Sequence, residues 1–135
     1  MIILYPPSFK SLGEKVMLFS KYSLDGEPYT LWYKFPKKYR DYLVVERLDA
    51  FLVGLLFLGL KTGKDIYVKG PISHRLYYSI NHYLIEILCA ANPFYKKIKI
   101  IVEELNKRDL NMVNSAGTGL SCGVDSFATY YDHIE

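Results

Sequence analysis

Residues 111–133 read NMVNSAGTGLSCGVDSFATYYDH and divide into three parts. Small or apolar residues fill positions 112–120 and predict a strand, while residues 127–131 predict the first turns of a helix. Between them lies S-C-G-V-D-S at 121–126, a tight turn of small residues. A helix N-terminus presents unpaired backbone N–H groups and the positive end of the helix dipole. We therefore expect this strand–turn–helix order to hold an anion, specifically a nucleotide phosphate.

Three residues of this turn suit such a site. Gly123 lets the backbone approach a ligand closely or adopt a positive φ. Ser121 and Ser126 add hydroxyl groups that can donate hydrogen bonds. The alternative interpretation is an ordinary strand-to-helix turn that is rich in small residues and has no ligand.

The turn also resembles a known signature, the S-G-G-x-D-S motif of the PP-loop ATP pyrophosphatases. This family includes GMP synthetase, asparagine synthetase, NAD synthetase, 7-cyano-7-deazaguanine synthase and the tRNA-modifying thiolases and lysidine ligases. Cys122 stands where the motif has a glycine, and four positions agree with it: Ser121, Gly123, Asp125 and Ser126. The resemblance implies that the loop binds the pyrophosphate part of ATP while a substrate oxygen attacks the α-phosphate. The implied nucleotide site consists of Ser121, Cys122, Gly123, Val124, Asp125 and Ser126.

Asp125 implies a metal if the site works in this way. A carboxylate beside a triphosphate repels it unless a cation intervenes, so the resemblance implies Mg²⁺ at Asp125 through the nucleotide. Without a ligand, the same carboxylate is simply favourable at a helix N-terminus. Cys122 is interpreted as a tolerated small side chain, with a reactive thiol as the alternative. The P-loop pattern G-x-x-x-x-G-K-[ST] does not apply, because no lysine follows Lys107.

The composition predicts one globular unit. Half of the 135 residues are hydrophobic and 16% are aromatic, which excludes a disordered tail. The formal net charge is 17 − 14 = +3, too small to indicate nucleic acid. Cys89 and Cys122 form neither a metal-binding spacing nor a disulfide framework, which is typical of the cytoplasm. The longest apolar run, residues 50–60, is well short of the roughly 20 residues that span a bilayer, so we expect no membrane span.

The position of the motif predicts the domain organisation. Nine residues follow Ser126, whereas the PP-loop domain continues beyond this motif with further strands. We expect residues 1–105 to form an N-terminal α/β domain of unknown role. Residues 106–135 are then the start of a truncated PP-loop domain. On this interpretation the chain is the N-terminal part of a longer protein and is inactive by itself.

The strands are predicted from alternation and turn residues. Residues 15–23 and 29–35 alternate on either side of Asp25-Gly26, a pattern that predicts a β-hairpin. Residues 1–9 begin as a strand that the paired prolines break. A basic, aromatic patch follows the hairpin at residues 37–40, and we interpret it as a solvated turn.

Two helices are predicted between further strands. The first covers residues 41–62, is apolar on all sides from Ala50 onward, and ends at Gly63, so we expect it to be buried. The second covers residues 74–91, between the N-cap Ser73 and the pair Asn92-Pro93. Strands are expected at 65–68, ended by Gly70-Pro71, and at 96–105.

Charged residues near the start of the first helix need an explanation. Glu46 and Asp49 are three positions apart and share a face, with Arg47 offset from it. Unpaired buried charge is costly, so a buried ion pair is favoured over a substrate pocket. The candidates for substrate binding are Glu46, Arg47 and Arg75.

These elements predict an α+β, or mixed α/β, fold with an antiparallel hairpin at one side and the first strand–loop–helix of a PP-loop domain at the end. The resemblance implies an enzyme that uses ATP and Mg²⁺ to adenylate a substrate oxygen and release pyrophosphate. The alternative is a non-enzymatic domain for partner interaction or homodimerisation, since an incomplete sheet leaves an edge and apolar surface. RNA binding rests on one short patch and ranks last: Lys37, Lys38, Tyr39 and Arg40.

Overall fold

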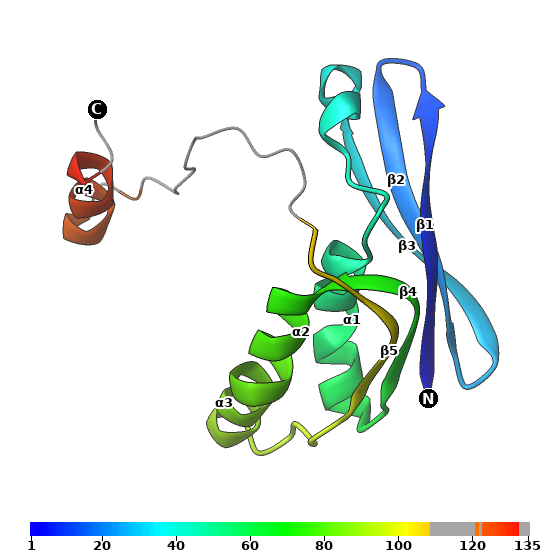
Figure 1. Ribbon diagram of the computed structural model, residues 1–135, viewed down its shortest axis with the longest axis vertical. Coiled ribbons are helices and arrows are strands. Elements are labelled where there is room, and N and C mark those ends of the chain that lie inside the picture. Colours follow the sequence, from blue (N-terminus) through cyan, green and yellow to red (C-terminus); the bar gives the residue numbers. More distant parts are fainter. Residues whose placement is uncertain (109–120, 122, 133–135) are drawn as a thin grey trace.

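The computed structural model describes residues 1–108, 121 and 123–132. Its strands are β1 (Ile2–Leu12), β2 (Lys15–Leu24), β3 (Glu27–Pro36), β4 (Ile66–Ser73) and β5 (Ile100–Asn106). Its helical elements are the 3-10 helix η1 (Lys37–Tyr42), α1 (Asp49–Thr62), α2 (His74–Ser79), the π-helical turn η2 (Ile80–Leu84), α3 (Ile85–Ala91) and α4 (Val124–Tyr131). The strands form one sheet in the order β3-β2-β1-β4-β5 (Figure 1). The predicted strand at 112–120 lies outside the described residues.

The sheet is mixed, as the sequence predicts. The pairs β1–β2 and β2–β3 are antiparallel, whereas β1–β4 and β4–β5 are parallel, with Ile66 paired to both Ile2 and Ile100. Helix α1 leads from the antiparallel strands into β4, so the connection between the parallel neighbours β1 and β4 also contains β2, β3 and η1. The helical run α2–η2–α3 connects β4 and β5. The α+β fold with an antiparallel hairpin at one side is thus confirmed.

The hairpin turn is the two-residue loop that Asp25-Gly26 predicts. Leu24 pairs with Glu27, and both loop residues have positive φ, 55° at Asp25 and 93° at Gly26. This combination matches the right-handed twist of the flanking strands and favours Asp-Gly. The Asp25 carboxylate also binds the Lys64 ammonium and, at 3.2 Å, the amino group of Met1.

Strand β1 does not end at its prolines, and the predicted break is wrong. It continues to Leu12 with an irregularity in its pairing between Leu4 and Pro7. Proline is tolerated there because pairing of β1 with β4 extends only over Ile2–Leu4, so no ladder on that side requires a proline N–H. The buried Ser20 hydroxyl donates to the carbonyl of Tyr5 at 2.5 Å and satisfies that oxygen at the irregularity.

Helix α1 begins at Asp49, eight residues later than predicted. The preceding segment crosses the end of β4, where Leu48 N–H donates to the Pro71 carbonyl and Ser73 N–H donates to the Asp49 carboxylate. These contacts hold residues 43–48 out of helical geometry. The predicted end is confirmed, because Gly63 has φ 66° and closes the helix in the left-handed conformation.

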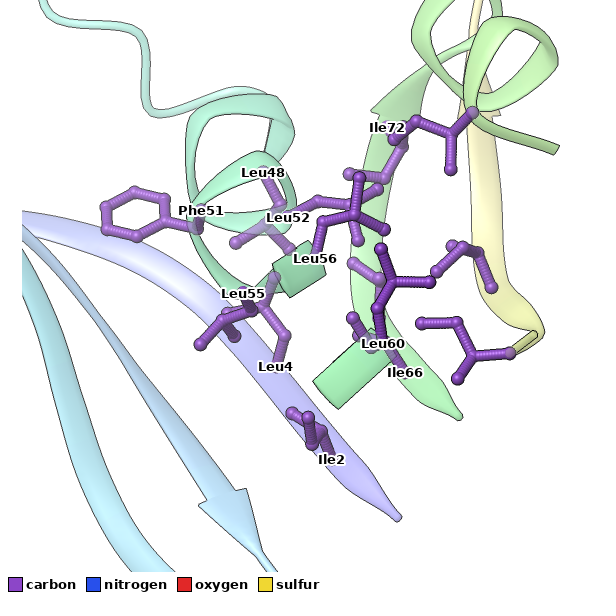
Figure 2. Packing of buried hydrophobic residues seen from close by; sticks show 14 of the residues in the cluster. Ile2, Leu4, Leu48, Phe51, Leu52, Leu55, Leu56, Leu60, Ile66 and Ile72 are labelled. Atoms are coloured by element: carbon purple, nitrogen blue, oxygen red, sulfur yellow. The ribbon is translucent and has the colours of Figure 1, made fainter. Parts of the chain in front are cut away.

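The core lies between one face of the sheet and the helices α1, α2 and α3. Leu52, Leu56 and Leu60 of α1 are buried against Ile2 and Ile66, as Figure 2 shows. Burying one such side chain contributes roughly 1.5–3 kcal/mol. Only this face of α1 is buried, since Val53 and Phe57 on its other side are exposed, so the expectation of a fully buried helix is wrong.

The second predicted helix is continuous but contains a π-helical turn. Ser73 caps it as predicted, with the Leu76 N–H donating to the Ser73 hydroxyl at 3.3 Å. In the middle, the Ile85 N–H donates to the carbonyl of Ile80, five residues earlier. This spacing brings both isoleucines into the core.

None of the described helices is both long enough and apolar enough to cross a membrane.

Strand β5 starts at Ile100 rather than at Lys96. The preceding residues are tied to the end of α1 and the start of β4: Lys96 N–H donates to the Leu60 carbonyl, and Lys99 N–H donates to the Asp65 carboxylate at 2.8 Å. These residues therefore run as an irregular segment before the ladder begins.

Candidate functional site

A cleft of about 320 Å³ opens at the carboxyl ends of the parallel strands β4 and β5. We call it the cationic cleft, and its lining residues are Arg47, Ser73, His74, Arg75, Asn106, Lys107 and Arg108. Four of these residues are lysines or arginines, and none of the seven is acidic. The carboxyl edge of parallel strands is the usual position of ligand sites in open α/β sheets.

The fold assembles this cleft from three distant segments. Arg47 comes from the segment before α1, His74 and Arg75 begin α2, and Asn106 ends β5. The first segment is fixed by the hydrogen bond from Leu48 to Pro71 at the end of β4. The arginines proposed for substrate binding therefore meet at one site, although 28 positions separate them in sequence.

Arg47 carries hydrogen-bonding capacity that the described residues do not use. Its Nη2 lies 3.5 Å from Asn106 Oδ1, a long hydrogen bond. Its Nε is buried and has no acceptor among the described residues. A buried N–H without a partner is costly, and a guanidinium matches the geometry of phosphate or carboxylate oxygens. The cleft thus has the charge and the donors for an anionic group.

Glu46 does not belong to the cationic cleft. It precedes α1, so the predicted shared helical face with Asp49 is wrong. Its carboxylate accepts the Val45 N–H at 3.1 Å on the surface, while the Asp49 carboxylate accepts the Ser73 N–H. The expected buried ion pair is not formed either, because the ion pairs among the described residues involve other acids, Asp25 and Glu86.

The motif residues that the structure describes sit at the start of α4. Gly123 is the N-cap, α4 begins at Val124, and Asp125 lies in the first turn, so the predicted helix after the turn is confirmed. Gly123 has φ −89° and ψ 171°, an extended conformation open to any residue, so of the two roles considered for this glycine the positive φ is not found. Cys122 lies outside the described residues.

Two serine hydroxyls close the turn across the helix start. Ser126 Oγ accepts the Ser121 N–H at 3.1 Å and lies 2.9 Å from Ser121 Oγ. Ser126 is buried, while Ser121, Gly123 and Asp125 are exposed. Because Gly123 has no side-chain oxygen, the cap position itself supplies no acceptor to the first-turn amides of α4.

A metal site made by the protein alone is not seen in the described part of the chain. No group of three or more His, Cys, Asp or Glu side chains gathers there. Mg²⁺ at Asp125 would therefore need the phosphates of a nucleotide as further ligands, since Mg²⁺ in phosphate sites uses one or two carboxylates together with substrate oxygens.

Sequence reasoning missed Asn106, Lys107 and Arg108 as part of a site. From sequence they are placed only at the start of the second predicted domain, residues 106–135. Their signal was their position directly after a strand with a parallel neighbour, where polar side chains gather at a ligand-binding edge.

Comparison of the chain with protein-family models, with curated proteins and with solved structures found no match.

Proposed function

We propose that this chain is the N-terminal part of an ATP-dependent enzyme of the PP-loop type. The observation that carries the proposal is the arrangement of the described motif residues, Ser121 and 123–126, at a helix start. Ser121 and Ser126 close the turn, and Asp125 occupies the first turn of α4. Exposed backbone at Gly123 and the positive end of the α4 dipole favour the pyrophosphate group of ATP.

In the proposed reaction, an oxygen of the substrate attacks the α-phosphorus of ATP. The bond between the α-phosphorus and the bridging oxygen to the β-phosphate breaks, and pyrophosphate leaves with that electron pair. A nitrogen or sulfur nucleophile then displaces AMP from the adenylated substrate. The turn residues stabilise the charge that builds on the leaving pyrophosphate. Asp125 would hold the Mg²⁺ that neutralises part of this charge.

The cationic cleft supports a second part of the proposal, the binding of an anionic group of the substrate. Arg47 and Arg75 provide two guanidinium groups there, and Lys107 and Arg108 add further charge. Bidentate contacts from arginine give orientation as well as affinity, which is what a substrate-positioning site needs. Glu46 lies outside this cleft and remains the least supported of the three substrate candidates.

The test is a calorimetric titration of the full-length protein with ATP in the presence and absence of Mg²⁺. Asp125→Ala should remove the metal-dependent binding. Asp132→Ala, at the other end of α4, is the matched control and should bind as the wild type does. Metal-dependent binding justifies an assay for pyrophosphate release, whereas a folded protein that binds no ATP overturns the proposal.

Partner interaction or homodimerisation is the second candidate function, and an apolar groove favours it. The groove has a volume of about 560 Å³ and lies between the hairpin and α1, with Leu18, Tyr33 and Val53 among its lining residues. Burial here raises the pKa of the Tyr33 hydroxyl. Light scattering of the wild type and of Val53→Asp would test it, since a charge in the groove should dissociate a dimer that uses this surface.

A further inference from the structure

The face of the sheet opposite the core carries aromatic rings and lysines. Side chains alternate between the two faces of a strand, so residues next to buried positions point to the other side. In β2, Val16, Leu18 and Ser20 are buried, which places Met17 and Phe19 on the outer face. We define the aromatic–lysine face by Tyr5, Lys10, Phe19, Trp32, Lys34 and Lys69.

The register of the strands brings these side chains together. Phe19 of β2 lies directly opposite Trp32 of β3, so the two large rings are cross-strand neighbours. One row further, Met17 pairs with both Lys10 and Lys34. Helices α1, α2 and α3 pack on the other face, through the core that they share with β1 and β4. Trp32 is consequently 49% exposed.

Each of three lysines lies over an aromatic ring of this face. Lys34 Nζ is 4.5 Å from the ring centre of Trp32. Lys10 lies over Phe19 at 5.9 Å and Lys69 over Tyr5 at 5.2 Å. Cation–π contacts at exposed sites are weak, so these ammonium groups can turn toward a ligand at small cost while the rings become available for stacking.

The charge of the face is one-sided. Lys15 and Lys21 alternate onto it beside Lys10 and Lys34. Strands β1–β3 are described throughout, and their outward-facing residues include no Asp or Glu. An acidic residue enters the same side of the sheet only beyond these strands, at Glu103 of β5, which accepts a hydrogen bond from the Tyr67 hydroxyl of β4. The net charge of +3 therefore understates the local field over β1–β3.

We infer that the aromatic–lysine face binds single-stranded nucleic acid. Unpaired bases stack on Trp32 and Phe19, and lysines on either side of these rings contact the phosphates. Exposed rings interleaved with cations are the combination that binds single strands, because every base has a face to stack and every nucleotide carries a charge. A duplex fits less well, since its bases are already stacked on one another. The rings also distinguish this ligand from an acidic peptide, which needs the lysines alone.

The sole tryptophan makes the inference directly measurable. We would titrate the protein at low salt with oligouridylate of about 10 nucleotides. The two signals are Trp32 fluorescence and the anisotropy of a labelled oligonucleotide. We expect quenching of Trp32 and an anisotropy increase with the same midpoint. Affinity should fall as salt rises, with a log–log slope of about −0.7 for each phosphate contacted.

Variants separate stacking from charge. Trp32→Ala or Phe19→Ala should weaken binding about 5- to 150-fold, as expected for the loss of one stacked base. Trp32→Phe keeps an aromatic ring and should retain most of the affinity. This result would show that Trp32→Ala acts on the binding site and not on the fold. Lys34→Glu should weaken binding and flatten the salt dependence. The matched controls are Phe94→Ala, an 81% exposed ring in another region, and Lys61→Glu at the end of α1.

Three results would overturn the inference. The first is no anisotropy change at low salt. The second is binding that Phe94→Ala and Lys61→Glu weaken as much as Trp32→Ala and Lys34→Glu do, which indicates non-specific charge attraction. The third is concentration-dependent self-association that Trp32→Ala abolishes, with no oligonucleotide bound, which assigns the face to a second copy of the chain. Failure of the nucleic-acid inference would be independent of the ATP titration, because Asp125 is not part of the aromatic–lysine face.

Discussion

Arg47 Nη2 lies 3.5 Å from Asn106 Oδ1, although 59 positions separate the two residues in sequence. The contact connects the segment before α1 to the end of β5 and gives the cationic cleft two of its walls. The Arg47 Nε beside it is buried without an acceptor among the described residues. The fold thus holds a guanidinium in place before any ligand arrives, which lowers the entropy that binding would cost.

Replacing Arg47 should weaken anion binding in the cationic cleft. A hydrogen bond to a charged group is worth about 1.5–3 kcal/mol, so Arg47→Ala should reduce the affinity for a small dicarboxylate such as succinate by roughly tenfold or more. Calorimetry with succinate measures this. Arg40→Ala is the matched control, because Arg40 is exposed and lies over the Phe9 ring, away from the cleft. Equal affinity in Arg47→Ala and the wild type would show that the cleft does not bind the anion.

The hairpin turn should make stability depend on acidity. Hydrogen bonds from Lys64 and from the N-terminal amine lower the pKa of Asp25 below its ordinary value of 3.8. A lowered pKa means that the contribution is present above 3.8 and is lost as the pH falls through the folded-state pKa. Asp25→Asn should therefore be less stable than the wild type at neutral pH and equally stable in strong acid. Urea unfolding at both pH values measures this, and a difference that persists in acid would contradict the ion-pair explanation.

Gly59 should resist replacement by alanine, contrary to the usual helix preference. Alanine is favoured over glycine inside a helix by about 1 kcal/mol. At Gly59, however, an added Cβ would lie 2.7 Å from Ile98 Cδ1 and 3.2 Å from the Lys64 carbonyl oxygen. Overpacking of a core costs about 1–3 kcal/mol, so Gly59→Ala should lower the free energy of unfolding. Val53→Ala, on the exposed side of the same helix, should change it by less than about 0.5 kcal/mol. A Gly59→Ala variant that is more stable than the wild type would show that Gly59 is packed less closely than these distances indicate.

Ser20 should be required for the irregularity in β1. Its buried hydroxyl donates to the carbonyls of Tyr5 and Lys21, at 2.5 and 3.0 Å. Ser20→Ala leaves the Tyr5 oxygen without this donor, which should cost about 1–3 kcal/mol. Ser8→Ala, an exposed serine on β1, is the control and should be near neutral. Thermal unfolding of both variants measures the difference, and two equal melting temperatures would contradict this role.

Local signals in the sequence were sufficient for the turns and caps. Asp25-Gly26 determines its turn by backbone preference alone, and Ser73 and Gly63 act on their own helix ends. The start of α1 was not predictable in this way. Asp49 is positioned by the Ser73 N–H, a partner 24 residues later, and no pattern in residues 41–48 reports that contact.

The residues of the cationic cleft were likewise not predictable as one site from local sequence signals. Arg47 is a candidate from sequence because charge near the start of the first predicted helix needs an explanation, and Arg75 is named beside it without a pattern of its own. Their meeting with Asn106 depends on the order of β4 and β5 in the sheet, which the sequence pattern leaves open. The motif gave a helix start that the structure confirms at Val124, and the nucleotide that it implies stays a prediction.

The central strand β1 pairs with one strand that is near it in the sequence and with one that is far from it. The two pairings therefore close chain loops of different length. It pairs with β2 across a short turn, but with β4 it brings Ile2 beside Ile66. Closing a long loop costs more chain entropy, so the β1–β2–β3 meander should assemble before the parallel half of the sheet. Pulse-labelled hydrogen exchange during refolding would reveal this order through early protection of β2 amides. Synthesis on the ribosome favours the same order, because the meander is complete before β4 and β5 have been translated.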